Sequence, residues 1–246
     1  MLCNVDAKQL EWIVAAYLSQ DEVAINEIRQ GLDLHADNQK RFNLPSRVVA
    51  KVLLFRTIYG GTGYSFANDP EFGYLGSEGW WDEKITEFYA KYKGLYAWHE
   101  RLYERVVRDN GRLVLPTGRV YQFQVYHNRN GEVRYHRPII LNYPVQGLAD
   151  DLMKIARVSL WKRLHDPRWY GSPAGILFVN SVHDSIILDI ESKVWDNDRD
   201  RIVKLIQCVF EDVPKNFKNL FDIEFNLPVR CEITYGMDWK NMSEIK

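Results

Sequence analysis

The feature that most constrains the fold of this chain is a pair of short apolar segments separated by a tight polar step. Residues 176–180 and 186–190 are rich in Ile, Leu, Val and Phe and have the length of strands. The step between them contains Val182, His183, Asp184 and Ser185. The pattern predicts a hairpin of two apolar strands with the carboxylate of Asp184 at its tip.

Helical and strand-like periodicities around this hairpin predict an α+β fold. Apolar residues recur at helical spacing over 10–28, 47–59, 80–108, 138–164 and 198–213. Gly31 is expected to end the first of these helices, and Asp33-Leu34-His35 to open a short one. Residues 2–6, 113–125, 132–135 and 229–234 resemble strands, and 68–79, rich in Gly, Pro and Asn, predicts a loop.

Composition excludes several classes of protein. With 46% hydrophobic and 26% charged residues, the 246-residue chain is neither disordered nor fibrous. Its apolar stretches are far shorter than the ~20 residues of a membrane span. Three cysteines are too few for a disulfide framework, which favours a reducing compartment. A net charge of −1 argues against a protein that coats nucleic acid by bulk charge.

A second carboxylate, Asp6, ends the strand-like segment 2–6. Taken alone, Asp6 or Asp184 is most simply a cap or a surface turn residue. Two strand-borne carboxylates from distant parts of the chain, if brought side by side, would repel each other unless a cation lay between them. Together they predict a two-metal phosphoryl-transfer site that binds Mg²⁺ through few carboxylates plus substrate phosphates.

The segment 47–60 contains a third group of candidate residues, which recur every four positions. Steps of four on a helix advance by only ~40° beyond a full turn, so the four side chains form one slanting stripe. The stripe consists of two cations followed by two aromatic residues: Arg47, Lys51, Phe55 and Tyr59. It is either part of an ordinary amphipathic helix or the lining of an open cleft that grips a triphosphate and stacks on a sugar and base.

Together these residues resemble the family A (bacterial polymerase I-like) DNA polymerases, including the phage replicative members. Residues 6–11 resemble motif A (Asp-x-x-Gln-x-Glu), the stripe and Gly60 resemble motif B, and 182–184 resemble motif C. Minor matches follow in the family order at 33–35, 117–119, 142–147 and 227–239. The resemblance covers essentially the whole chain. It implies a right-hand polymerase whose palm is an antiparallel sheet with helices and whose fingers are helical.

The resemblance implies a role for each matching residue. Asp6, Asp184 and the carbonyl of Ala7 would bind two Mg²⁺ ions, for which Mn²⁺ is a substitute, and Lys51 would donate a proton to pyrophosphate. His183 could instead be an ordinary turn histidine, and Gln146 a helix cap. The implied nucleotide-binding residues are Gln9, Glu11, His35, Arg47, Lys51, Phe55 and Tyr59, and the implied DNA-binding residues are Arg119, Asn142, Gln146 and His183.

One position departs from the family pattern. Ser185 follows the motif C aspartate where the family usually has Glu, and His-Asp-Ser resembles the single-subunit phage-type RNA polymerases. Glu11 and Phe55 favour the DNA polymerases instead, because a residue as bulky as Glu11 excludes a ribose 2′-hydroxyl. Loss of the third carboxylate is expected to weaken metal binding modestly. An RNA polymerase or primase, and a non-catalytic DNA-binding assembly subunit, are the alternatives.

Only five residues precede Asp6, whereas family members carry several hundred residues before motif A. The chain is therefore expected to comprise palm (1–30 and 136–246) and fingers (31–135), without thumb or exonuclease domain. The hypothesis is a split polymerase whose second polypeptide supplies thumb, N-terminal palm and, in some arrangements, a 3′–5′ exonuclease. Primer-template DNA and dNTPs are the other expected partners. We expect no membrane association and a cytoplasmic location, that of the bacterial host if a phage encodes the chain.

Overall fold

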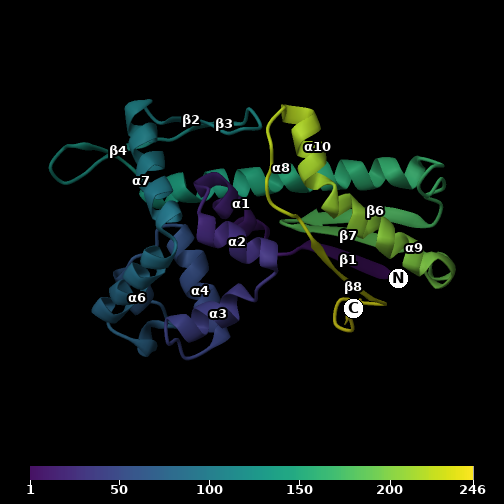
Figure 1. The fold of residues 1–246 in the computed structure, drawn as a ribbon, viewed down its shortest axis with the longest axis horizontal. Helices are drawn as coiled ribbons and strands as arrows, with labels where there is room; N and C mark the ends of the chain where they lie inside the picture. Colours follow the sequence, from purple (N-terminus) through teal and green to yellow (C-terminus); the bar gives the residue numbers. More distant parts are fainter. Residues whose placement is uncertain (246) are drawn as a thin grey trace. The chain divides into compact units, whose positions relative to one another are not determined.

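The computed structural model describes residues 1–245, which form two compact units. One unit comprises Met1–Trp12 and the chain from Leu148 onward, and the other comprises Ile13–Gly147. Figure 1 labels the helices and strands of each unit. The predicted division into palm and fingers stays a prediction.

The first unit is built on an antiparallel five-stranded sheet that confirms the predicted hairpin. The strand order is β6-β7-β1-β8-β9, so the N-terminal strand lies in the middle of the sheet (Figure 1). Along the central strand, burial alternates, and Cys3, Val5 and Ala7 are buried. The strands are β1 (Leu2–Ala7), β6 (Ile176–Val182), β7 (Ser185–Ile190), β8 (Cys231–Gly236) and β9 (Ser243–Glu244).

Helices complete this unit. Helix α9 (Ser192–Glu211) packs against β8, and the rings of Trp195 and Tyr235 lie 5.1 Å apart there. Arg163, near the end of α8 (Arg137–His165), forms an ion pair with Asp212 at the junction of α9 and α10 (Val213–Phe221). The periodicity predicted α9 from Asp198 only and did not predict α10, which begins directly after Asp212.

The second unit is mainly helical. Helix α3 packs on α4, and α6 contacts α4, α5 and α7. Large side chains from these helices form the core, including Phe66 stacked on Trp81 with ring centroids 4.5 Å apart. None of the helices within residues 1–245 has both the length and the apolar character needed to cross a membrane. The helices are α1 (Leu10–Ser19, from Ile13 in this unit), α2 (Glu22–Gln30), α3 (Leu34–Arg41), α4 (Arg47–Ile58), α5 (Gly63–Ala67), α6 (Glu78–Lys91) and α7 (Lys93–Arg108), with a 3₁₀ turn at Gly73–Leu75.

Two expected long helices are each broken in the structure. The segment 10–28 divides at Gln20, whose φ of 52° is left-handed, and α2 restarts with Asp21 as its N-cap. The segment 80–108 divides at Tyr92, which ends α6 and precedes α7. Gly31, with φ of 67°, ends α2 as expected. Helical periodicity predicted the apolar faces correctly but missed both breaks.

The strand-like segments 113–125 and 132–135 form two separate hairpins. Strand β2 (Arg112–Val114) pairs with β3 (Val120–Gln122), and β4 (Val125–His127) pairs with β5 (Val133–Tyr135). The Asn128 carboxamide oxygen accepts from the amides of Asn130 and Glu132, which closes the second hairpin. The two hairpins form separate two-stranded sheets.

Candidate active site

The two predicted carboxylates lie at the ends of adjacent strands of the first unit. Asp6 is opposite Ser185 in the pairing of β1 with β7, so Asp184 directly precedes its cross-strand partner. The amide of Ala7 donates to the carbonyl of Asp184 at 2.9 Å, which ties the strand end to the hairpin tip. The structure therefore brings Asp6 and Asp184 together as the sequence predicted.

The electrostatic surroundings of Asp6 disfavour its negative charge. Partial burial raises the pKa of the Asp6 carboxyl, and the neighbouring charges of Asp184 and Glu232 raise it further. The hydroxyl of Ser185 donates to Oδ1 of Asp6 at 2.8 Å and acts in the opposite direction, lowering that pKa. Two carboxylates held in this way form a natural place for a cation, because a bound cation relieves their repulsion.

The donor set fits a hard divalent cation that keeps other oxygen ligands. Within residues 1–245, no group of three or more His, Cys, Asp or Glu residues could enclose a metal ion. Mg²⁺ is commonly bound by one or two carboxylates plus water and substrate phosphates, so the Asp6–Asp184 pair suits that ion. Structural zinc, which needs four closed N or S ligands, does not fit this set.

The other predicted residues of this unit lie close to Asp6 or Asp184 in the sequence. Gln9 and His183 are exposed and adopt left-handed backbone conformations, with φ of 51° at each. A left-handed backbone is uncommon for residues other than Gly, and at His183 it marks a tight turn. This conformation fits either a turn histidine or a functional one. Glu11 is half-buried in the first turn of α1.

In the second unit, the predicted stripe is present on α4. Ser46 caps the helix by accepting from the amide of Val49, and the helix ends with Tyr59 as its C-cap. Arg47 and Lys51 are exposed, whereas Phe55 is half-buried. The ammonium of Lys51 lies 5.9 Å from the centre of the Phe55 ring. The cationic half of the stripe is thus open to solvent, as a phosphate-binding surface requires.

His35 joins the stripe from the neighbouring helix α3. Its ring lies 6.2 Å from that of Phe55, and its buried Nδ1 has no hydrogen-bond partner within the described residues. Burial lowers the pKa of His35, and the positive charges of Arg47 and Lys51 lower it further. Arg47 itself is oriented by Asp33, the N-cap of α3, with Nε 3.1 Å from Oδ2. The structure therefore groups His35 with Arg47, Lys51 and Phe55.

The predicted DNA-binding residues of this unit also lie near one another. Asn142 and Gln146 are one helical turn apart on α8, and Gln146 is exposed. A Cβ on Gly147 would lie 1.8 Å from the Tyr121 hydroxyl and 3.2 Å from Cδ of Arg119. The β2–β3 hairpin thus packs directly on α8, and Gly147 is required for that close approach.

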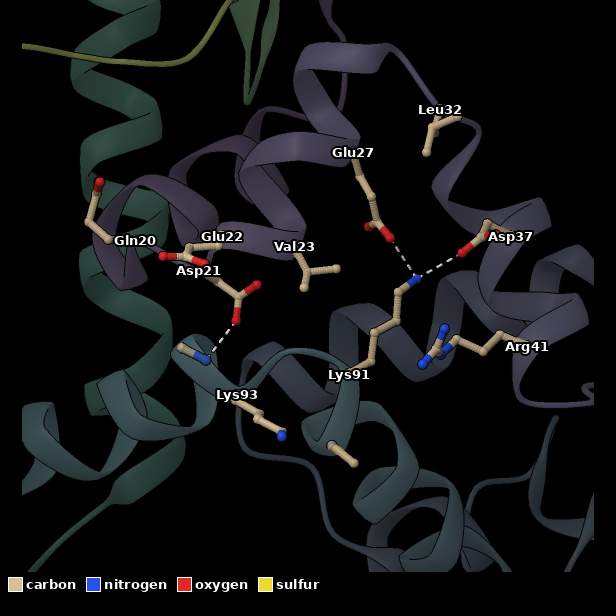
Figure 2. A pocket seen from close by; sticks show the side chains of 12 residues that line it. Gln20, Asp21, Glu22, Val23, Glu27, Leu32, Asp37, Arg41, Lys91 and Lys93 are labelled. Carbon is tan, nitrogen blue, oxygen red and sulfur yellow. Dashed lines mark hydrogen bonds and ion pairs between the residues drawn. The ribbon is translucent and has the colours of Figure 1, made fainter.

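A cavity elsewhere in this unit contains none of the predicted site residues. It has a volume of about 760 Å³ and lies among α2, α3 and the α6–α7 junction (Figure 2). The buried ammonium of Lys91 bridges Glu27 and Asp37, at 2.8 Å from each, and Asp21 accepts from the amide of Gly94 (Figure 2). These paired charges hold the helices together, so we assign the cavity a structural role.

Sequence reasoning missed two neighbours of Asp6. It interpreted Ser185 as a missing carboxylate and as a resemblance to the RNA polymerases, whereas the structure shows its hydroxyl donating to Asp6. It did not identify Glu232, which is opposite Asp6 across β1 and β8 and forms an ion pair with Lys8 at 3.0 Å. Only the register between the first and last long strands of the sheet could have revealed Glu232.

Comparisons with known proteins identify relatives over nearly the whole chain. The family model for DNA polymerase family A matches residues 1–241. The thermostable DNA polymerase I of Thermus filiformis is 28% identical over 97% of this chain, and DNA polymerase I of Lactococcus lactis subsp. cremoris (strain MG1363) is 26% identical over 97%. The chain spans 27% and 26% of those relatives, about a quarter of their length.

A solved structure shows the same fold. The POL domain of Pol1 from M. smegmatis, in complex with DNA primer-template and dNTP, aligns with a TM-score of 0.73. The alignment covers 97% of this chain and 40% of that one, at 19% sequence identity. The predicted α+β architecture is confirmed, and the family match over nearly the whole chain leads to one conclusion: this chain belongs to DNA polymerase family A.

Proposed function

We propose that this chain carries the nucleotidyl-transfer site of a template-directed DNA polymerase, which adds dNTPs to a primer 3′-hydroxyl. The observation that carries the proposal is the pairing of Asp6 with Asp184 at adjacent strand ends. Paired carboxylates next to a strand-borne backbone carbonyl suit two-metal phosphoryl transfer. Family membership supports the proposal, since the relatives named above are DNA polymerases.

The proposal gives each residue group a task. Mg²⁺, when bound, would lower the pKa of the primer hydroxyl and neutralise charge on the triphosphate. Asp6, Asp184 and the carbonyl of Ala7 supply its protein ligands. Arg47, Lys51 and His35 bind phosphate oxygens, and Lys51 donates a proton to the leaving pyrophosphate. Phe55 and Tyr59 pack on the nucleotide, and Gln9 and Glu11 complete its binding residues.

The DNA contacts follow from the same proposal. Arg119, Asn142, Gln146 and His183 are assigned to primer and template. The small net charge of −1 is compatible with this function because binding depends on local groups such as Arg47 and Lys51, both exposed. A cytoplasmic location is part of the same proposal.

The decisive test of the proposal is Asp184→Ala in the complete polymerase. We expect Mg²⁺-dependent primer extension to fall by at least ~1,000-fold, because removing a group that acts in the transition state costs several kcal/mol. Asp189→Asn is the matched control, since Asp189 lies on β7, the strand that follows Asp184, and its carboxylate forms an ion pair with the N-terminal ammonium. Normal extension by Asp184→Ala would overturn the metal assignment.

The split arrangement is a finer part of the proposal. We infer that a second polypeptide pairs with this one to supply thumb, N-terminal palm and any exonuclease activity. One structural observation supports it: β6 is the last strand at its side of the described sheet, and Leu177, Val179 and Val182 are exposed on it. An apolar strand edge of this kind favours pairing with further chain. The relatives named above match only through about a quarter of their length, which is compatible with either a longer single chain or a split one.

A further inference from the structure

We propose that Ser185 is a positioning residue for Asp6, and that its hydroxyl holds the Asp6 carboxylate in the orientation that binds the cation. The inference rests on the proposed function, because it concerns the metal-binding carboxylate of that site. It gives a specific role to a residue that stands where the family usually has a carboxylate.

The geometry of the two strands carries the inference. Asp6 and Ser185 are directly opposite in the antiparallel pairing of β1 with β7, so their side chains project from the same face of the sheet. The Ser185 Oγ donates to Oδ1 of Asp6 at 2.8 Å. A hydrogen bond to one carboxylate oxygen restricts the rotamer of Asp6 and leaves Oδ2 without that donor. Outer partners of this kind orient metal-binding carboxylates in proteins.

The hairpin in turn holds Ser185. The hydroxyl of Ser181, on β6, donates to the backbone carbonyl of Ser185 at 3.2 Å. On the neighbouring strand β1, the amide of Ala7 donates to the carbonyl of Asp184 at 2.9 Å. The backbone on both sides of the Asp6–Ser185 pair is therefore fixed by hydrogen bonds.

The charge balance explains why a neutral donor suits this position. Asp6 already has two acidic neighbours, Asp184 across the hairpin and Glu232 on β8. Lys8 neutralises part of the Glu232 charge through an ion pair at 3.0 Å. A hydroxyl at position 185 stabilises the ionised Asp6 by hydrogen bonding and adds no further negative charge to the cluster.

The inference is tested by measuring Mn²⁺ binding to the intact chain in the absence of DNA and nucleotide. The electron paramagnetic resonance signal of free Mn²⁺ reports how much of the ion remains unbound. Ser185→Ala is expected to weaken binding roughly tenfold, at the low end of the effect of removing an outer partner of a ligand. Ser185→Thr keeps the hydroxyl and should bind within about twofold of the wild type, since β-branched residues suit strands. Ser192→Ala, which removes an exposed hydroxyl at the start of α9, is the matched control and should bind like the wild type. Thermal unfolding followed by circular dichroism identifies any variant that fails to fold.

Each outcome distinguishes this inference from the proposed function. Weak binding by Ser185→Ala with restored binding by Ser185→Thr supports it. Equal binding by Ser185→Ala and the wild type, with loss in Asp6→Asn, overturns the positioning role and leaves the metal site intact. Equal loss in Ser185→Ala and Ser185→Thr also overturns it, because the hydroxyl is then not the cause. Undiminished binding by Asp6→Asn, or no binding by the wild type, overturns the metal assignment itself and this inference with it.

Discussion

A single side chain, Glu11, is expected to decide which sugar the proposed site accepts. It lies five residues after Asp6 in the first turn of α1 and is half-buried, which limits its freedom to move aside. Glu11→Ala should therefore lower the discrimination against ribonucleotides, by at least ~10-fold if one steric contact is worth 1–3 kcal/mol. The measurement is the ratio of kcat/KM for a dNTP and the matching rNTP.

Glu22→Ala is the control for this prediction, since Glu22 occupies the first turn of α2 and is exposed. It should leave the ratio unchanged. A wild-type enzyme that already prefers ribonucleotides would contradict the prediction. That result would favour the RNA polymerase interpretation suggested by Ser185.

His99 is expected to make the second unit less stable at acidic pH. The side chain is fully buried, and its Nδ1 lies 3.1 Å from the Tyr89 hydroxyl. Burial is the main cause that lowers its pKa from 6.5 to about 3, and the positive charge of Arg137 lowers it further. The unfolded chain therefore binds a proton between these values while the folded chain does not, so stability is full above pH 6.5 and falls as pH decreases towards 3. The expected loss by pH 4.5 is on the order of 2 kcal/mol.

This effect is measured by urea unfolding of the wild type and His99→Gln at pH 7 and pH 4.5. His99→Gln should be less stable at pH 7 but should lose less stability between the two pH values, because it removes the titrating group. His165→Gln changes an exposed histidine and should keep the wild-type pH dependence. An identical pH dependence in His99→Gln would show that His99 does not titrate as expected.

At the scale of elements, Asp21 links two helices that the sequence pattern does not connect. Its Oδ1 accepts from the amide of Ala24 and caps α2, and its Oδ2 accepts from the amides of Gly94 and Leu95 at the start of α7. The residue is buried. Asp21→Ala removes the cap and leaves amides of α7 without an acceptor, which should cost about 3 kcal/mol of unfolding free energy.

Asp21→Asn is the matched variant, because an amide has one acceptor oxygen and cannot serve both helices. It should lose an intermediate amount of stability. Hydrogen exchange provides the second measurement: the amides of Gly94 and Leu95 should exchange faster in both variants. Equal stability of Asp21→Ala and the wild type would contradict the linking role.

Asp21 also shows why helix boundaries were harder to predict than helix faces. The apolar residues of 10–28 keep helical spacing through the break, so periodicity joined α1 to α2. The break depends on a left-handed Gln20 and on a carboxylate whose other partners are more than seventy residues away in α7. Local signals such as Gly31 and the Ser46 cap could be predicted from the sequence, because their hydrogen-bond partners lie within one helical turn.

The candidate site also has parts that the sequence predicts and parts that it does not. The sequence indicates Asp6 and Asp184 because each lies at the end of an apolar strand. It indicates the α4 stripe because residues four apart share one face of a helix, whatever that helix packs against. The contacts of Ser185 and Glu232 with Asp6 depend on strand register, which no local pattern encodes. The grouping of His35 with Phe55 was anticipated only through the family resemblance.

At the scale of the whole molecule, the exposed edge strand leads to a prediction about activity. Val179 is 49% exposed on β6, and its neighbours Leu177 and Val182 are exposed as well. If a second polypeptide pairs along this edge, primer extension by this chain alone should be weak, and the product of a neighbouring gene should restore it. The measurement is extension of a labelled primer by each polypeptide separately and by the mixture.

The edge contact itself is tested by Val179→Lys, because a charged side chain on an edge strand opposes pairing with another strand. The variant should need a higher concentration of the second polypeptide to reach half-maximal extension, by roughly tenfold for a loss of 1.4 kcal/mol of binding free energy. Val158→Lys places the same charge on an exposed valine of α8 and should behave like the wild type. Long products made efficiently by this chain alone would rule out the split arrangement and leave the nucleotidyl-transfer assignment untouched, because that assignment depends on Asp6 and Asp184 rather than on the strand edge.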